Sequence, residues 1–300
     1  MTLGSIGRAG AVGVLLLALA GCAVSSRRAL DPADRTPAGG RDAVVSVVQE
    51  RVQANAMQAP AATAQFSAGH SFASGALAGA IGAMAQQLVA ESQHNETLDF
   101  VMPLLDALSD YDFDGKALQA SSDGLARLPW LDVRKVSFSK DASDTAVGQA
   151  LQQSQAAETL FINYSYAFAD RFASLQVSAV VAIIAKRGSA AHPHADAVFL
   201  QRFTYLATLP SHSRDYKRNT LDWANDHGRL ARAAVDQGLL QLNAMIQRSL
   251  EQTPEQADQM RHGDIVNVGD RGGRLVEKSE AGMLLIDPYD TWLYVSAPPQ

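Results

Sequence analysis

The sequence predicts an α/β fold in which helices pack against a mixed sheet, as a sandwich of two or three layers. The first indication is a strand, a helix and a strand in succession, at about residues 130–138, 144–157 and 160–168. Strands of one sheet that a helix connects in this way run parallel, with a right-handed crossover. The second indication is a pair of long strands at 175–186 and 198–209, which a Gly-, Ser- and Pro-containing loop joins as an antiparallel hairpin.

The N-terminal half supplies one further strand and two helices. The β-branched run Val44 to Val48 predicts the first strand. Apolar residues at helical spacing between 98 and 128 predict two helices, which the polar turn at 111–115 separates. Pro129 ends the second helix, because the residue before a proline is disfavoured in helical geometry.

A segment of small residues lies between these elements, in an interval from Arg51 to Glu91 that has no Asp, Glu, Lys or Arg within it and only His70 as a titratable side chain. Gly75, Gly79 and Ala83 recur there at spacing four, so they share one face of a helix that another backbone can approach closely. One interpretation is a helix that enters a membrane or joins copies of the chain. The other is a soluble helix packed under the sheet, since Ala, Gly and Ser give only a weak membrane signal.

The C-terminal part predicts a long helix and a small β-meander. The helix, at about 214–252, carries an apolar stripe that steps by three and four residues: Ala231, Val235, Leu239, Leu242, Ile246 and Leu250. Short strand runs follow at 274–276, 283–286 and 292–295. We therefore expect an α/β domain at 43–253 and a separate meander at 264–298.

The N-terminus has the layout of a secretory signal peptide, predicted over residues 1–21. Arg8 is its only charged side chain, and an apolar run too short to span a bilayer follows it. The run closes on Leu19-Ala20-Gly21-Cys22, which resembles a bacterial lipobox, and Cys22 is the only cysteine of the 300 residues. The resemblance implies cleavage before Cys22 and acylation of that residue by palmitate or a similar chain. The alternative is an ordinary signal peptide with a chance cysteine.

Charge bears on the partners of the mature chain. Loss of Arg8 leaves 24 of the 25 basic residues against 31 acidic ones, a net charge of −7. Nucleic acid is therefore not an expected partner, and anionic lipid does not attract the protein electrostatically. Membrane attachment would come from acyl chains on Cys22, because stable anchoring takes more than one chain.

The position and the tether of this anchor are also predicted. Ala23 follows the cysteine, and resemblance to Gram-negative lipoproteins implies outer-membrane localisation on the periplasmic side. Residues 22–42 carry no apolar periodicity and predict a lipidated cysteine with a flexible tether, whose extended length is at most about 70 Å.

No motif predicts an enzyme, and no catalytic residue or cofactor is assigned. A Gly-x-Ser-x-Gly elbow, a phosphate-binding loop and His-Glu-x-x-His are all absent from the sequence. The weak metal-ligand candidates are His192, His194 and Asp196, which alternate along an extended stretch. They fall in the predicted hairpin loop, where a solvated histidine-rich turn is the simpler interpretation.

Three polar or aromatic groups have residue types that suit a site. In the cluster from Asp222 to Gly228, an acid beside His227 suits proton transfer, but Asp residues that favour a helix start and a Trp223 core anchor explain it as well. The Asp110, Asp112 and Asp114 loop is too short a ligand series for calcium. The aromatic residues Tyr164, Tyr166, Phe168, Phe199, Phe203 and Tyr205 suit a sugar or lipid, or simply the core of the sheet.

A resemblance rests on the lipobox, Asp112-Phe113, Pro129-Trp130-Leu131, the strands from Leu160 and Leu175, and Asp222-Trp223-Ala224. Together these residues resemble a group of Gram-negative envelope lipoproteins. Their α/β domain is similar to the N-terminal domain of TolB and to the lipoproteins of curli secretion and of penicillin-binding-protein activation.

The resemblance implies a non-enzymatic, periplasm-facing outer-membrane lipoprotein that binds an envelope protein or assembles into a homo-oligomer. The first alternative is an oligomeric pore or export component that uses the Gly75–Ala83 helix. A further alternative is a hydrolase or metal-dependent enzyme that uses His192, His194 and Asp196.

Overall fold

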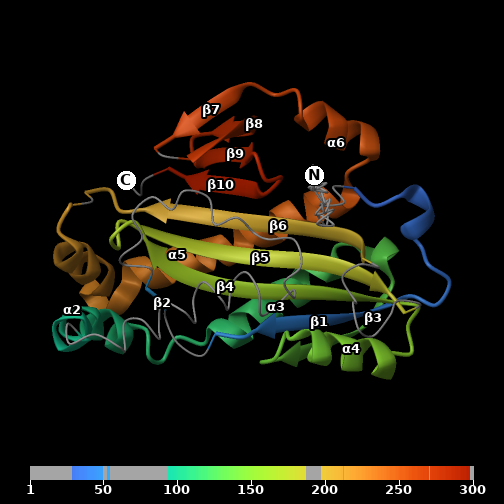
Figure 1. The fold of residues 1–300 in the computed structure, drawn as a ribbon, viewed down its shortest axis with the longest axis horizontal. Helices are drawn as coiled ribbons and strands as arrows, with labels where there is room; N and C mark the ends of the chain where they lie inside the picture. The colour runs from blue at the N-terminus through green and yellow to red at the C-terminus, as the bar shows by residue number, and fades with distance from the viewer. Residues whose placement is uncertain are drawn as a thin grey trace, which may run out of the picture.

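The fold is built on a ten-stranded mixed sheet (Figure 1). It is described by a computed structural model that covers residues 29–49, 53–54, 94–186, 197–211, 213–269 and 271–297. The strand order is β3-β1-β4-β5-β6-β10-β9-β8-β7, and β2 also pairs with β4. The strands are β1 (Arg41–Val47), β2 (Gln53–Ala54), β3 (Val133–Ser139), β4 (Glu158–Ala169), β5 (Ser174–Ala185), β6 (Ala197–Thr208), β7 (Ile265–Val268), β8 (Arg271–Ser279), β9 (Gly282–Ile286) and β10 (Trp292–Ser296).

The pairing of the strands confirms the predicted α/β class. Strand β1 is parallel to both β3 and β4, so it lies between the two strands that the predicted crossover joins. Strands β4, β5 and β6 are antiparallel neighbours, as the predicted hairpin requires. The helices are α2 (His94–Ala107), α3 (Phe113–Ala126), α4 (Asp144–Gln153), α5 (Tyr216–Glu251) and α6 (Pro254–Met260), with short 3₁₀ turns η1 (Pro32–Asp34) and η2 (Pro129–Leu131).

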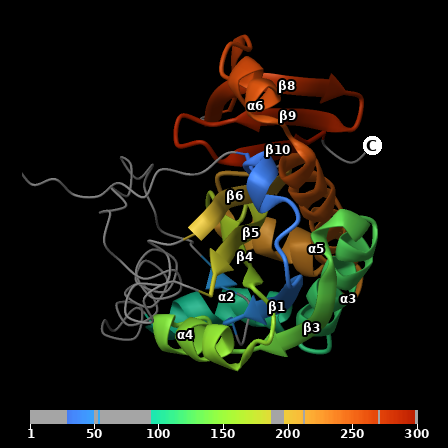
Figure 2. The same cartoon turned by 90° about the vertical axis from the view of Figure 1, so that its right-hand side faces the viewer.

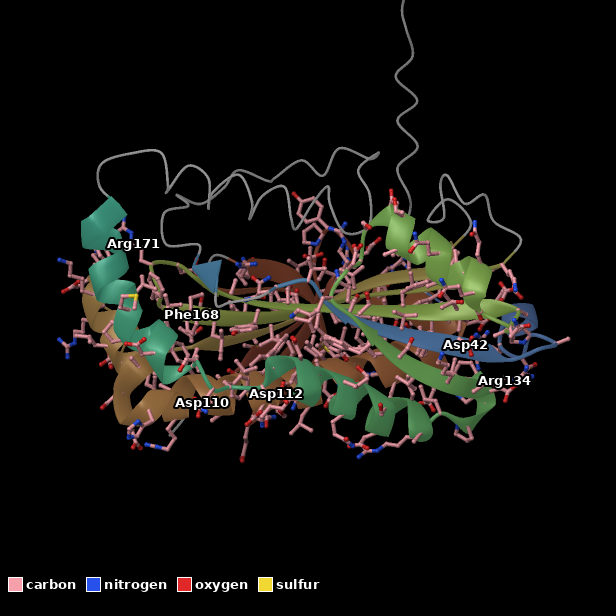
Figure 3. The ribbon with its side chains drawn as sticks, turned by 90° about the horizontal axis from the view of Figure 1, so that it is seen from below. Asp42, Asp110, Asp112, Arg134, Phe168 and Arg171 are labelled. Carbon is pink, nitrogen blue, oxygen red and sulfur yellow. The ribbon has the colours of Figure 1, made fainter. Side chains whose placement is uncertain are left out.

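The helices cover the sheet unequally. Helices α3 and α5 lie on one face, and α4 lies on the other (Figures 2 and 3). The main core fills the space under α5, whose predicted stripe from Ala231 to Leu250 is fully buried at every predicted position. Gly238 allows this close packing, because a Cβ there would lie 2.7 Å from the Val177 side chain of β5. A smaller cluster joins Val147 and Leu151 of α4 to the opposite face.

Helix α5 differs from the continuous helix that the sequence predicts. The backbone leaves helical geometry at Asn225, and Asp226, His227 and Gly228 have φ values of 52°, 54° and 71°. These are the residue types that tolerate left-handed backbone best. The apolar stripe could not reveal the break, because it begins only at Ala231. Helix α6 was also absent from the prediction, although Thr253 and Gln256 form a capping box around Pro254.

The C-terminal meander is not a separate unit, so the predicted boundary between 253 and 264 is wrong. Strand β10 pairs in parallel with β6, with Trp292 opposite Phe203 and Tyr294 opposite Tyr205. The meander therefore continues the main sheet and has a fourth strand, β7, ahead of the three predicted runs. The pairing joins residues about ninety positions apart, and no local pattern encodes it.

The predicted tether is also wrong from residue 29 onward. Leu30 is fully buried in the main core, and strand β1 begins at Arg41 rather than after Asp42. The Pro- and Gly-containing composition of this stretch is typical of a linker, but its residues pack on the domain.

Several predicted features lie outside the described residues: the signal peptide with Cys22, the Gly75–Ala83 segment, and His192, His194 and Asp196. Within the described ranges, no helix is both long and apolar enough to cross a membrane.

Candidate functional site

An open hollow of about 610 Å³ lies beside the break in α5. It brings together two groups that the sequence marked separately, namely Asp110 after helix α2 and the Asp226-His227 pair of α5. Figure 3 labels Asp110 and Asp112 where they lie between α2 and α3. The full lining is Asp106, Ala107, Asp110, Asp226, His227, Arg229, Arg232, Ala233 and Asp236.

The left-handed turn in α5 sets the shape of this hollow. The Asn225 side chain accepts a hydrogen bond from the Asp226 backbone N–H at 2.9 Å, which closes the turn locally. Gly228 then packs against α2, where a Cβ would stand 3.1 Å from the Ala107 carbonyl oxygen. The turn therefore needs glycine at 228 for both its backbone angle and its close contact with α2.

Two arginines pair with carboxylates of the hollow, and Arg232 joins α5 to the end of α2. Arg232 forms an ion pair with Asp110 and donates to the carbonyl oxygens of Ala107 and, at 3.0 Å, His227. Arg229 pairs with Asp226 at 2.6 Å. The hydrogen bond from Arg232 is the main reason why the pKa of the Asp110 carboxyl is lowered from its ordinary value.

A second charged group flanks the hollow at Tyr111. Its hydroxyl donates to Asp236 at 2.7 Å, and Lys116 binds the same carboxylate at 2.8 Å. Lys116 and Arg232 also lie over the Tyr111 ring, at 5.2 and 5.8 Å from its centre. Burial, and then the hydrogen bond to Asp236, raise the pKa of Tyr111 well above its ordinary value.

Charged side chains make up most of the lining of the hollow. Within the described chain, no hydrogen bond joins the His227 side chain to Asp222 or Asp226, and the acid that interacts with it electrostatically is Asp110. In the same ranges, no cluster of three His, Cys, Asp or Glu residues is placed to hold a metal ion. The lining has four aspartates and two arginines, and three of the aspartates form ion pairs with Arg232, Arg229 and the flanking Lys116.

Trp223 is a core anchor, as the simpler interpretation of its cluster predicts, but the cluster does not open the helix, because α5 begins at Tyr216 with Asp215 as its N-cap. Its indole N–H donates to the Phe172 carbonyl oxygen at 2.7 Å, and its ring packs edge-on against Phe168. Asn219 donates to the Arg171 carbonyl oxygen at 2.9 Å. These bonds hold the β4–β5 turn, in which Asp170, Arg171 and Phe172 all have positive φ.

The aromatic residues of β4 and β6 belong to the sheet core, as the simpler interpretation predicts. All six side chains are buried beneath the helices. The Tyr164 hydroxyl accepts from Ser121 at 3.0 Å and donates to Asn243 at 3.4 Å, and burial raises its pKa to about 12. These rings are therefore not exposed to a sugar or a lipid.

The opposite end of the domain carries a fully buried ion pair that sequence reasoning missed. Arg41 donates to Glu158 at 2.8 Å from the neighbouring strand β4. Its remaining N–H groups donate to the carbonyl oxygens of Asp34, Arg35 and Leu131. Burial raises the pKa of Glu158 despite the opposing effect of Arg41. The only sequence signal was a basic residue three positions before the β-branched run that begins at Val44.

No known protein-family model matches this sequence, and no curated protein matches it either.

Proposed function

We propose that the protein is a non-enzymatic outer-membrane lipoprotein that faces the periplasm and serves as a protein-interaction or assembly module. The observation that carries the proposal is the motif Leu19-Ala20-Gly21-Cys22 at the end of a short apolar segment, with Cys22 as the only cysteine. Acyl chains on that residue would hold the acidic domain at a membrane that does not otherwise attract it.

The hollow beside the α5 break is the proposed contact surface for the partner. It is open, charged and held in shape by the Arg232 bonds to Asp110 and Ala107. Among the described ion pairs Asp106 has no basic partner, whereas the other three lining aspartates do, so one carboxylate is left over for a Lys or Arg side chain of the other protein. Such complementarity contributes to specificity and to the rate of association.

The anchor is tested by growth of cells that express the protein with labelled palmitate. We expect label in the wild-type protein and in the membrane fraction, and neither in a Cys22→Ser variant. A wild-type protein without label, or a variant with unchanged size and fractionation, would overturn the anchored part of the proposal.

The contact surface is tested with a photo-crosslinking amino acid at Ala233, which lines the hollow, and at Lys135, an exposed residue of β3. We expect a defined envelope protein to be captured from position 233 and not from position 135. Equal capture at both positions, or none at 233, counts against the hollow as the contact surface.

The alternative of an oligomeric pore or export component rests on the spacing of Gly75, Gly79 and Ala83. Native mass measurement of the detergent-extracted protein separates the two proposals. A ring supports the pore, and a monomer supports the simple module.

A further inference from the structure

Residues 29–41 cross one end of the domain as a strap, and they are fastened there at several points. Leu30 is fully buried in the main core. Arg35 donates to the carbonyl oxygens of Glu251 and Gln252, both at 3.0 Å, and so binds the end of helix α5. The Arg35 guanidinium also lies 5.7 Å from the centre of the Trp130 ring.

Arg41, at the start of strand β1, also binds the strap. Buried Arg41 donates to the carbonyl oxygens of Asp34 and Arg35, while Glu158 balances its charge. The backbone between these points closes on itself, because the N–H of Asp34 bonds to Asp31 and that of Gly40 bonds to Pro37. Release of the strap would leave part of a buried guanidinium without acceptors, which is unfavourable.

The strap leaves little chain between the domain and the proposed anchor. Only seven residues, Cys22 to Arg28, precede the described part of the chain. Fully extended, seven residues span at most about 25 Å, compared with about 70 Å if the whole stretch to Asp42 were free.

The domain is longer than this reach. Strand β4 has twelve residues, and at the usual rise per residue it spans about 40 Å. Its first residue, Glu158, contacts the strap through Arg41, and its last residue lies at the turn that carries Arg171. Figure 3 shows the two ends, with Asp42 and Arg134 at one and Phe168 and Arg171 at the other.

We infer that the strapped end is the bilayer-facing end of the protein and is held within about 25 Å of the lipid headgroups. The end with the β4–β5 turn extends away from them, to about 65 Å at most. This inference rests on the proposed attachment at Cys22. It restricts the partner to a protein at the outer membrane or one that reaches this close to it.

Energy transfer tests the inference in a way that does not depend on natural acylation. The mature chain has a single thiol at Cys22, which can be coupled to maleimide-bearing lipid in neutral vesicles that also contain a headgroup acceptor dye. A donor dye is placed through an introduced unnatural amino acid at Gln155, an exposed residue at the strapped end, or at Arg171. We expect transfer to be several-fold more efficient from 155 than from 171.

Equal transfer from the two positions, or stronger transfer from 171, would overturn the inference. The Arg35→Ala variant sharpens the test, because release of the strap lengthens the tether and should lower transfer from 155. Lys135→Ala is the matched control and should leave transfer unchanged. Unchanged transfer in Arg35→Ala would also contradict the fastening role of Arg35.

Hydrogen exchange on the uncoupled protein provides a second readout. The hydrogen-bonded amides of Asp34, Arg35 and Gly40 should be protected in the wild-type chain and exchange faster in Arg35→Ala, while those of β5 stay protected in both. Fast exchange of these amides in the wild-type protein would contradict the inference that residues 29–41 are held on the domain. Neither measurement uses cellular acylation. A wild-type protein that takes up no labelled palmitate would therefore contradict the proposed function, whereas unprotected amides in residues 29–41 would contradict the packing of the strap.

Discussion

The two ends of this domain differ in how many of their residues have strained, left-handed backbone geometry. The strapped end depends on satisfied polar groups around Arg41, and two of its non-glycine residues in the described chain have positive φ, namely Asp132 and Asp290, which lines the same small hollow as Gln252. The far end has five such residues, in the β4–β5 turn and in the α5 break: Asp170, Arg171, Phe172, Asp226 and His227. The end proposed to face the membrane is held by hydrogen bonds and a buried ion pair, whereas the end proposed for recognition has more residues in strained backbone geometry.

This strain needs compensation from nearby bonds. A non-glycine residue in left-handed geometry costs on the order of 1–2 kcal/mol. Trp223 and Asn219 offset the cost at the β4–β5 turn, and Arg232 does so at the α5 break. Strained residues of this kind concentrate at functional sites, which agrees with the placement of the hollow at the same end.

The largest expected effect comes from the strapped end. Glu158→Gln removes the countercharge of fully buried Arg41, and loss of one partner of a buried pair costs about 3–5 kcal/mol. Urea unfolding measures the change. Asp132→Asn is the control, because it breaks an exposed pair with Arg134 at 3.7 Å that contributes at most about 1 kcal/mol. Similar losses in both variants would show that burial of the pair is not decisive.

An intermediate effect is expected at the α5 break. Gly228→Ala places a methyl group near the Ala107 carbonyl oxygen in left-handed backbone, and should lower the free energy of unfolding by about 1–2 kcal/mol. His227→Gly is the opposite change, because it relieves strain, and should not destabilise the fold. If His227→Gly destabilised as much as Gly228→Ala, the turn would not be a strained element.

The smallest effect is electrostatic. Arg232→Ala removes the group that lowers the pKa of Asp110, so that pKa should rise toward its ordinary value in an NMR titration of the side-chain carboxyl. In the wild-type protein the Asp110 carboxylate stabilises the fold above its ordinary pKa, and this contribution is lost as the pH falls through the lowered value. Arg229→Ala, whose partner is Asp226, should leave Asp110 unchanged. An equal shift in both variants would contradict the specific pairing.

Local patterns predicted most of the elements. The strand at 160–168 was evident because its apolar and polar residues alternate, and the stripe from Ala231 to Leu250 because it follows the helical period. The break at Asn225 was missed because it lies ahead of that stripe. The hollow was only partly predicted, since its two halves were recognised but nothing local indicates that Asp110 and His227 meet.

By itself, the sequence determined the α/β class and the order of most elements, because hydrophobic periodicity depends only on near neighbours along the chain. It also contains the Cys22 motif on which the proposed outer-membrane localisation rests. Only the tertiary structure decided that the tail joins β6, that residues 29–41 bind as a strap, and that the charged hollow forms. Each of these depends on contacts between distant residues, and such contacts are set by how whole elements pack.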